Sequence, residues 1–433
     1  MKLIGLICAL TAGVLVASIT AAPLGGKRVL VLLQSEADRD NYSQFLDSLA
    51  QLNFDITVRG HKDKGIKLKE YDHWNYDHLI LFAPKAESFG GSIDVPALLD
   101  FVDSGRNVIF GASSDVSDTM RGFAAEVGVD MDEKGSKVFD HFNHASIDGR
   151  ADHTLVISTE YTASSAGIPT QGPILYRGVG CSVAPDSELV AVALGAPTTA
   201  YSFNPRGPPP EAGELMAGSG LALVALVQAR NNARVLVSGS MDLFTNQLFN
   251  AQVVRGSDGA ALGASGNAAF ALSVARWALQ DRGVLEAEGL QHRLVAAPLG
   301  SPAPSHYRVL DDVEFSVKLW EREAGARRPY LADDVQVEFT MLDPHVRLPL
   351  SHDGQGNFSV RFKVPDVYGV FKYVLTYRRP GYSYVDLVQQ VPVHPFKHNE
   401  YERFLTCAYP YYASALSSML AFFALGWFFL YHK

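Results

Sequence analysis

The sequence predicts an α/β head with a doubly wound, mostly parallel sheet, followed by an antiparallel β-sandwich and one C-terminal transmembrane helix. Three observations predict this order. Strand-like and helix-like apolar patterns alternate over residues 28–111, apolar and polar residues alternate over 305–395, and residues 409–431 carry no charge. Alternating strands and helices are typical of a doubly wound sheet, and period two with frequent turns is typical of a sandwich.

Composition favours a folded chain of more than one domain. The chain has 433 residues, which at about 150 residues per domain suggests two or three domains. Hydrophobic residues make up 47% of the chain, which excludes disorder as its main state. Lys and Arg number 37 against 46 Asp and Glu, and no long basic run occurs, so the net charge of −9 disfavours nucleic-acid binding.

The N-terminus has the pattern of a secretory signal peptide, which we assign to residues 1–22. A single lysine precedes an apolar run over residues 3–16, and mostly small residues follow. This run is short for a bilayer span, so a cleaved leader is favoured over an uncleaved anchor. The leader predicts that the following domains lie in the lumen of the secretory pathway or outside the cell.

The first luminal α/β domain is expected over residues 23–150. It opens on a continuous apolar run over 28–33, typical of a strand buried on both faces. Apolar residues then recur at helical spacing, and short apolar runs lie between these segments. The expected elements are strand 28–33, helix 40–52, strand 54–58, strand 78–82, helix 95–102 and strand 107–110.

Residues 151–295 are expected to form a second α/β luminal region. A Pro/Gly-rich stretch over 204–213 predicts a surface loop within it. The pattern leaves open whether this region is a separate domain or completes the first sheet. Its expected elements are strands 154–158, 189–194 and 234–238 and helix 267–280.

The β-sandwich is expected over residues 305–395, after a proline-containing linker over 296–304. Turn signals separate its apolar alternations, as in an immunoglobulin-like sandwich, although the Cys…Trp…Cys set of true immunoglobulins is absent. The alternating apolar residues are Val335, Val337, Phe339 and Met341, then Phe358, Val360, Phe362 and Val364, with further strands at 370–377 and 384–393.

Residues 409–431 are long enough to cross a membrane. At 1.5 Å per residue the segment spans about 34 Å, and the apolar core of a bilayer is about 30 Å thick. Aromatic residues gather toward both ends, as an interfacial belt would. With the cleaved leader this predicts a type I protein whose tail, residues 432–433, is cytosolic. A removable lipid-anchor signal is the alternative, disfavoured because residues 400–403 are bulky and charged.

Small residues recur along one side of the expected span. Residues four apart lie on one helix face, and small side chains let a second helix approach closely. We therefore expect a helix-packing face, although serine and alanine also occur by chance in single spans. Its members are Ala413, Ser414, Ser417, Ser418 and Ala421.

Motifs for catalysis are missing. No glycine follows the first strand, where a phosphate-binding turn would lie, and no Gly-x-Ser-x-Gly nucleophile elbow occurs. Outside the leader and the membrane edge, Cys181 is the only cysteine, and a lone cysteine is more often core than nucleophile. The sequence therefore predicts no catalytic residue and no bound cofactor.

Two groups of polar residues were weighed as metal ligands. Neither has a recognised zinc spacing, and both fall where surface loops are expected, so loop residues are favoured and no metal is predicted. The groups are Asp72, His73, Asp77 and His78, and His141 with His144.

Two kinds of surface site are expected. The carboxyl ends of parallel strands form a crevice that often binds ligands. Here its candidates are Gln34, Ser35, Ser113 and Asp115, although a crevice covered by loops is an equal alternative. Two Asn-x-Ser triplets, at Asn41 and Asn357, are candidate glycosylation sites.

Several longer strings resemble the 48 kDa subunit family of the eukaryotic oligosaccharyltransferase. The resemblance runs from the first strand into the span. The strings are 76–84 (YDHLILFAP), 174–180 (ILYRGVG), 228–235 (QARNNARV), 238–244 (SGSMDLF), 365–371 (PDVYGVF), 401–404 (YERF) and 408–414 (AYPYYAS).

This resemblance implies a non-catalytic type I subunit of the endoplasmic reticulum membrane. The complex transfers a glycan from dolichol pyrophosphate to Asn of Asn-x-Ser/Thr in nascent proteins. The implied partners are a catalytic multi-spanning subunit that holds the divalent metal, the ribophorins and small membrane subunits. The resemblance also implies a glutamine-amidotransferase-like head without its nucleophile. Some family members end in a longer Lys-rich tail, so here partners are expected to provide retention.

Two other function classes compete with this interpretation. A membrane-anchored luminal hydrolase or glycosidase would use acidic residues that leave no sequence pattern, or Cys181. A cell-surface binding receptor would use the β-sandwich. On the residues alone these two rank about equally, and the family resemblance places both behind the oligosaccharyltransferase subunit.

Overall fold

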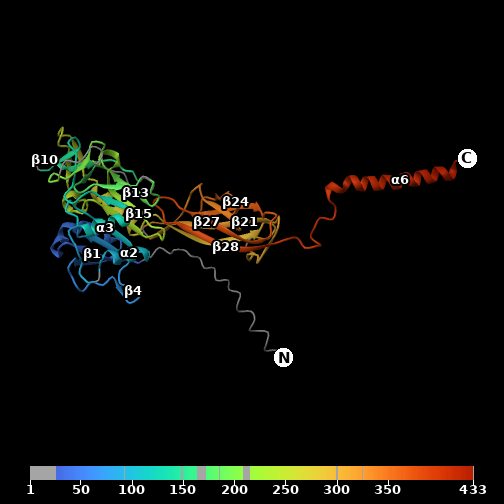
Figure 1. Ribbon diagram of the computed structural model, residues 1–433, viewed down its shortest axis with the longest axis horizontal. Helices are drawn as coiled ribbons and strands as arrows, with labels where there is room; N and C mark the ends of the chain where they lie inside the picture. Colours follow the sequence, from blue (N-terminus) through green and yellow to red (C-terminus); the bar gives the residue numbers. More distant parts are fainter. Residues whose placement is uncertain are drawn as a thin grey trace, which may run out of the picture.

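The computed structural model describes residues 26–432, except 92, 148–149, 163–171, 185, 208–214, 299–300 and 324. The expected signal peptide and Lys433 lie outside the described residues. Figure 1 shows three parts in chain order: an α/β head, a β-sandwich and the helix α6 (Tyr409–Tyr431).

The head is built on a nine-stranded sheet of described strands. Its order is β2-β1-β5-β6-β16-β15-β12-β7, with β13 also paired to β15. The first five strands of this order are parallel, and the pairs that follow are antiparallel. The bounds are β1 Arg28–Leu33, β2 Asp55–Gly60, β5 His78–Phe82, β6 Asn107–Gly111, β7 Val129–Met131, β12 Cys181–Val183, β13 Val190–Gly195, β15 Ala222–Gln228 and β16 Arg234–Ser238.

The strands of residues 28–111 in this sheet pair in parallel, as predicted, and the strands that join them after residue 111 make the whole sheet mixed. The reason is the short connection from β15 to β16, since only antiparallel neighbours can be joined by a tight hairpin. Asn232 takes a left-handed φ of 68° in this connection. Strands from both sides of residue 150 lie in this one sheet, so the second α/β region completes the sheet of the first.

Helices cover both faces of the parallel strands. Along β1, Val29, Val31 and Leu33 join the core that contains α1 and α5, whereas Leu30 and Leu32 join the core of α2 and α3. This alternation of buried faces explains the continuous apolar run. The helices are α1 Ser43–Gln51, α2 Val95–Asp103, α3 Asp118–Glu126, α4 Asn246–Phe249 and α5 Asn267–Ala278.

Short elements complete the head. The first helix was expected from residue 40, but a 3-10 turn, η1 (Glu36–Tyr42), capped by the side chain of Ser35, precedes α1. The other 3-10 turns are η3 Gly218–Gly220 and η4 Asp242–Phe244. The remaining strands are β3 Lys69–Glu70, β4 His73–Trp74, β8 Lys137–Phe139, β9 His144–Ile147, β10 Arg150–Ser158, β11 Ile174–Tyr176, β14 Tyr201–Phe203, β17 Gln252–Val254 and β18 Ala261–Ala264.

Two five-stranded sheets of described strands face each other in the sandwich. One has the order β19-β21-β26-β25 with β22 on β21, and the other β20-β28-β27-β23-β24. Apolar residues from both sheets form one core, in which Phe339 stacks on Phe371 at 4.6 Å between ring centroids. The bounds are β19 Val284–Leu294, β20 Tyr307–Arg308, β21 Asp312–Glu323, β22 Ala326–Pro329, β23 Gln336–Thr340, β24 Pro344–Pro349, β25 Ser351–His352, β26 Asn357–Lys363, β27 Gly369–Tyr377 and β28 Val385–His394.

Two details of the sandwich differ from expectation. The pair β20–β28 is parallel, although all other pairs among its described strands are antiparallel. The sandwich also begins at β19 rather than at residue 305. The register of β19 shifts between Glu288 and Gln291, and this irregularity interrupts the period-two pattern that would have revealed the strand.

A buried polar network joins the head to the sandwich. The guanidinium of Arg234 is fully buried and donates to the carbonyl oxygens of Trp277, Arg282 and Gly283 at 2.6–2.8 Å. The indole Nε1–H of Trp277 donates to the carbonyl oxygen of Gly381, in the hairpin between β27 and β28, at 2.8 Å. Burial lowers the pKa of Arg234 to about 9, so the side chain is still a cation at neutral pH.

Asparagine and glutamine side chains extend this network across the junction. Asn232 accepts from the backbone N–H of Tyr384 at 2.6 Å and donates to its carbonyl oxygen at 3.2 Å. Gln228 donates to the carbonyl oxygen of Tyr382 at 2.7 Å. Buried polar groups that are satisfied only across an interface oppose its separation, because separation would leave them unpaired.

A substitution at Gly283 would show how tightly the head and the sandwich pack at their junction. Its φ is +66°, and a β-carbon there would overlap the carbonyl oxygen of Gly381. Gly289 has a φ of +64° and open space around its own β-carbon position. Both alanine variants should lose about 1 kcal/mol from the left-handed backbone. Gly283→Ala should lose more, because the junction must shift.

The measurement is thermal unfolding of the detergent-solubilised chain. The midpoint of Gly283→Ala should fall below that of Gly289→Ala by about 2–4 °C for each further kcal/mol lost. Equal midpoints for the two variants would contradict the packing described here.

Candidate functional site

The carboxyl edge of the parallel strands is the candidate site. β1, β5, β6 and β16 end side by side, with Leu33 opposite Phe82 and Gly111 opposite Ser238. Two backbone hydrogen bonds connect the loops after β6 and β16. The N–H of Ala112 donates to the carbonyl oxygen of Ser238, and the N–H of Met241 donates to the carbonyl oxygen of Ala112, both at 2.7 Å. The edge therefore brings Gln34, Ser113 and their neighbours to one end of the sheet.

The four predicted crevice residues divide into two pairs. Ser35 caps η1, and Asp115 pairs with Lys85 at 3.1 Å, so both have structural partners. The side-chain oxygens of Gln34 and Ser113 are buried and have no hydrogen-bond partner among the described residues. A buried acceptor and a buried hydroxyl without partners are the groups that a bound water or ligand would satisfy.

Aromatic side chains close the edge from one face. The ring of Phe82 lies 5.0 Å from that of Tyr42 and 5.1 Å from that of Phe244, centroid to centroid. A β-carbon at Gly111 would lie 2.9 Å from the Phe82 ring, so the glycine allows this packing. Aromatic side chains of the protein itself therefore pack against this end of the sheet.

Cys181 lies in the core. It is 1% exposed, on β12, and burial raises the pKa of its thiol to about 12, with Asp132 adding to the rise. A thiol with so high a pKa supplies almost no thiolate at neutral pH, and thiolate is the nucleophilic form. Cys407, just before α6, is exposed, and the two are unpaired.

The structure separates the first group of predicted metal ligands. His78 is buried, Asp77 binds Arg28, and Asp72 and His73 lie exposed at the β3–β4 turn. Among the described residues, no group of three or more His, Cys, Asp or Glu side chains is arranged to hold a metal ion.

The second group gains a member that sequence spacing did not indicate. His153, on β10, lies 4.8 Å from His141 and 4.3 Å from His144 between ring centroids. Burial lowers the pKa of His144, and repulsion from His153 lowers it further, so the two imidazoles oppose being positively charged at the same time. Pairing of β9 with β10 creates this cluster, and only the tertiary structure reveals it.

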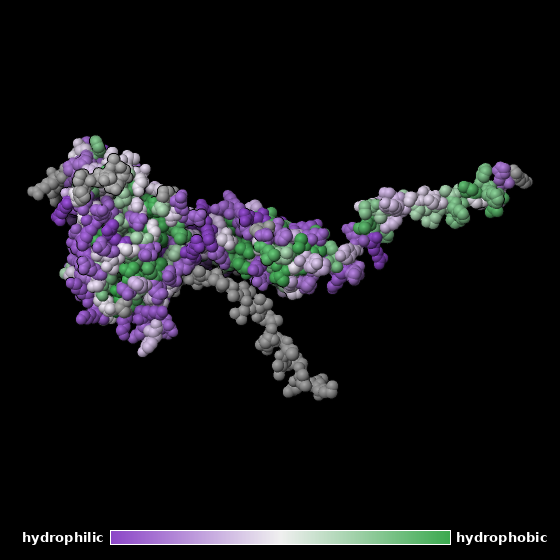
Figure 2. Space-filling view, in the orientation of Figure 1, coloured by the Kyte–Doolittle hydropathy of each residue, from purple (hydrophilic) through white to green (hydrophobic). Residues whose placement is uncertain are grey.

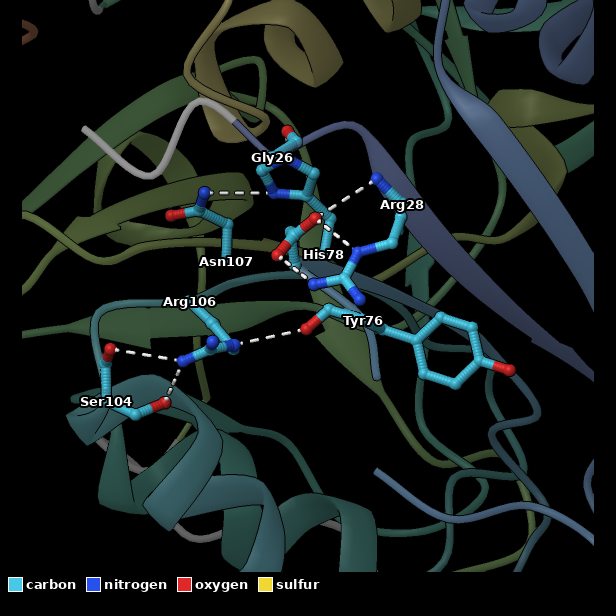
Figure 3. A network of polar contacts seen from close by, with 8 residues as sticks. Gly26, Arg28, Tyr76, His78, Ser104, Arg106 and Asn107 are labelled. Carbon is cyan, nitrogen blue, oxygen red and sulfur yellow. Dashed lines mark hydrogen bonds and ion pairs between the residues drawn. The ribbon is translucent and has the colours of Figure 1, made fainter. Parts of the chain in front are cut away.

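The amino edge of the sheet carries a second polar network (Figure 3). His78 lies at its centre, with Nε2 2.9 Å from the carbonyl oxygen of Gly26 and Nδ1 3.0 Å from Asn107 Nδ2. These partners require an imidazole with its proton on Nε2. Asn107 in turn accepts from the backbone N–H of Arg234 at 2.9 Å, which connects this network to the domain junction.

An Arg–Asp ion pair and a second arginine flank this histidine. The guanidinium of Arg28 donates to both carboxylate oxygens of Asp77, at 2.9 and 3.0 Å. Burial alone would raise the pKa of Asp77, but the hydrogen bonds from Arg28 outweigh it and lower the pKa. Arg106 donates to the carbonyl oxygen of Tyr76 and to Ser104. The polar side chains of this network therefore form hydrogen bonds with other residues of the amino edge, and we assign the network a structural role.

The remaining predicted residues lie on the surface. Hydroxyls of Ser414, Ser417 and Ser418 donate to carbonyl oxygens one turn back in α6, so their polar atoms are satisfied within the helix. Asn41 is exposed in η1, whereas the exposed Asn357 donates its amide to Asp353 at 2.5 Å. Helix packing and glycosylation both stay predictions.

Comparison with known proteins decides the family. The model of the OST48 N-terminal domain matches residues 20–281, and that of the OST48 middle domain matches residues 292–433. The chain belongs to the OST48 family. α6 continues from the preceding 3-10 turn, η5 (Thr406–Ala408), and is the one described helix long and apolar enough to cross a membrane. This member of the OST48 family is therefore membrane-anchored.

Three relatives of the OST48 family carry the same name, "Dolichyl-diphosphooligosaccharide--protein glycosyltransferase 48 kDa subunit". The chain is 41% identical to the Arabidopsis thaliana protein, covering 94% of this chain and 93% of that one. It is 39% identical to the Danio rerio protein, with coverage of 95% and 93%. It is 37% identical to the Caenorhabditis elegans protein, with coverage of 97% and 94%.

The buried His78 predicts a pH dependence of stability. Burial lowers its pKa to about 4 from an ordinary 6.5. Between these values the unfolded state binds more protons, so the stabilisation is complete above pH 6.5 and is lost as pH falls toward 4. The lost free energy of unfolding should approach about 3 kcal/mol.

The measurement is the thermal midpoint of the detergent-solubilised chain between pH 4 and 8. His78→Gln should flatten the decline between pH 6.5 and 4, and His73→Gln, at an exposed histidine, should leave it unchanged. A His78→Gln curve parallel to that of the unmodified chain would exclude the proposed role of this imidazole.

Proposed function

We propose that this chain is a non-catalytic subunit of the oligosaccharyltransferase of the endoplasmic reticulum. Its head and sandwich lie in the lumen, and α6 anchors it as a single-pass type I protein. The match of both OST48 family models, which together span almost the whole chain, carries the proposal. The complex transfers a glycan from dolichol pyrophosphate to Asn of Asn-x-Ser/Thr, and this subunit supports assembly and substrate positioning.

The chemistry of the described residues supports a non-catalytic role. The thiol of Cys181 is buried and protonated, and His78 is held neutral inside a structural network. The buried ionic groups at the amino edge and the domain junction bind protein atoms. A body whose polar groups mainly join its own parts is suited to hold other subunits in place.

Partners follow from the same proposal. We expect α6 to pack on membrane helices through its small-residue face, against the catalytic multi-spanning subunit or the small membrane subunits. Ribophorins are expected beside the luminal body. The head is proposed to descend from an amidotransferase-like fold, which its parallel strands β2, β1, β5, β6 and β16 support.

The first test separates subunit from enzyme. The tagged full chain is purified in mild detergent with its partners, and again in harsher detergent that removes them. Both samples receive a dolichol-linked donor and an Asn-x-Thr peptide. Only the assembly should transfer the glycan. Transfer by the stripped chain would overturn the non-catalytic role, and an assembly without transfer would overturn the proposed complex.

The carboxyl-edge crevice is proposed to contact the glycan or a partner subunit. Ser113→Gln would fill the space beside the unpartnered oxygens of Gln34 and Ser113. We expect a several-fold loss of transfer rate or of co-purified partners. Ser257→Gln, in the exposed β17–β18 turn, is the control and should change neither. Transfer and partner recovery that are both unchanged in Ser113→Gln would mean that the crevice is a relic.

A further inference from the structure

Most of the exposed large apolar residues of the sandwich gather at one end. Leu331 and Val388 are exposed elsewhere, but five others lie in three neighbouring segments, and it is such grouping rather than single exposed side chains that marks an interaction surface. We call this set the apolar tip. Its members are Leu310 (42% exposed), Leu342 (93%), Val367 (37%), Tyr368 (68%) and Val370 (55%).

Direct contacts make the tip one surface. The backbone N–H of Leu310 donates to the carbonyl oxygen of Val364 at 3.2 Å, and that of Val364 donates to Asp311 at 2.9 Å. A β-carbon at Gly369 would lie 2.6 Å from the sulfur of Met341, which joins the third segment. Leu310 also takes a left-handed φ of 62°, so a leucine there costs stability that an asparagine or glycine would not.

The tip lies at the end of the sandwich opposite the head. β27 begins at the tip with Gly369, and the hairpin after it contacts the head at Trp277 and Asn232. β28 then returns to the tip at His394, and the chain leads from there to α6. In Figure 1 the sandwich accordingly lies between the head and α6.

The segment before α6 folds back on the tip, which shortens its reach. The guanidinium of Arg308 lies 5.1 Å from the ring centroid of Phe396 and 3.9 Å from the carboxylate of Glu400. The ring of Phe396 in turn lies 5.4 Å from that of Tyr401. From Tyr401 to Tyr409 only eight residues are left, which span at most about 28 Å when extended.

We propose that the apolar tip inserts into the interfacial region of the bilayer that α6 crosses. The tip offers leucine and valine side chains with one tyrosine, the kind of residue that places its ring at the headgroup level. Two exposed carboxylates, Asp343 and Asp366, flank it beside one exposed cation, Lys363, so its charges do not favour an anionic surface and its ligand is a zwitterionic lipid surface. Figure 2 shows hydrophobic residues along much of α6, the segment long and apolar enough to cross a membrane.

A lipid surface fits the tip better than a partner protein does. The apolar side chains project from separate loops at the end of the sandwich, and the anchor emerges from the same end. Loop tips with apolar and aromatic side chains match a soft interface, in which each side chain finds its own depth. The proposal depends on the membrane anchor alone and stands apart from the role in glycan transfer.

The test measures depth in the membrane. The full chain with Cys407→Ser is reconstituted into phosphatidylcholine vesicles, since Cys181 is buried and should not react. Leu342→Cys and Tyr368→Cys each receive an environment-sensitive fluorophore, and lipids with spin labels near the headgroup act as quenchers. Control sites are Val388→Cys, 56% exposed on the same sheet, and Tyr71→Cys, 93% exposed on the head.

We expect quenching at residues 342 and 368 to exceed that at both control sites at least three-fold. Quenching at the level of the controls would overturn the proposal. A blue-shifted fluorophore that lipids do not quench, seen only when partner subunits co-purify, would assign the tip to a protein partner and would also overturn it. Neither result depends on glycan transfer, so the proposed function is tested separately.

Discussion

The buried polar network at the amino edge of the head sheet is the constraint on which the rest of the molecule depends. It runs from His78 through Asn107 to Arg234, and from there to Trp277 and the sandwich hairpin at Gly381. A fully buried guanidinium is costly unless it is hydrogen-bonded, and here its two terminal nitrogens donate to three carbonyl oxygens while its Nε has no partner among the described residues. Neighbouring groups of this network bond within the sheet and to the sandwich, so the two parts are coupled through buried polar groups that would lose their partners on separation.

Because the amino edge of the sheet faces the sandwich, other surfaces of the molecule are left free to bind ligands. The strands run from the junction toward the carboxyl edge, so the candidate crevice faces away from the sandwich. The apolar tip lies at the other end of the sandwich, beyond β21, whose twelve residues span about 40 Å. The crevice is therefore remote from the end of the sandwich that leads to α6.

The sequence correctly predicted those strands and helices whose apolar residues follow a regular local pattern. The parallel strands β1, β2, β5 and β6 and the helix α5 were expected, because buried strands and amphipathic helices have distinct periods. β15 was missed, and with it the hairpin that makes the sheet mixed. Arg234 carried no signal, since an arginine is buried only where tertiary structure supplies carbonyl oxygens.

Two membrane contacts would constrain the orientation of the head and the sandwich more than one contact does. A single helix joined by a short linker fixes the height of the body above the bilayer but leaves its tilt free. Because the head is coupled to the sandwich, a second contact at the apolar tip would fix the tilt of both. The serine hydroxyls of α6 already bind carbonyl oxygens of their own helix, so its small-residue face makes no polar demand on a partner. Orientation by the tip and lateral packing by α6 would then be independent of each other, and the crevice would be held at a defined height above the membrane.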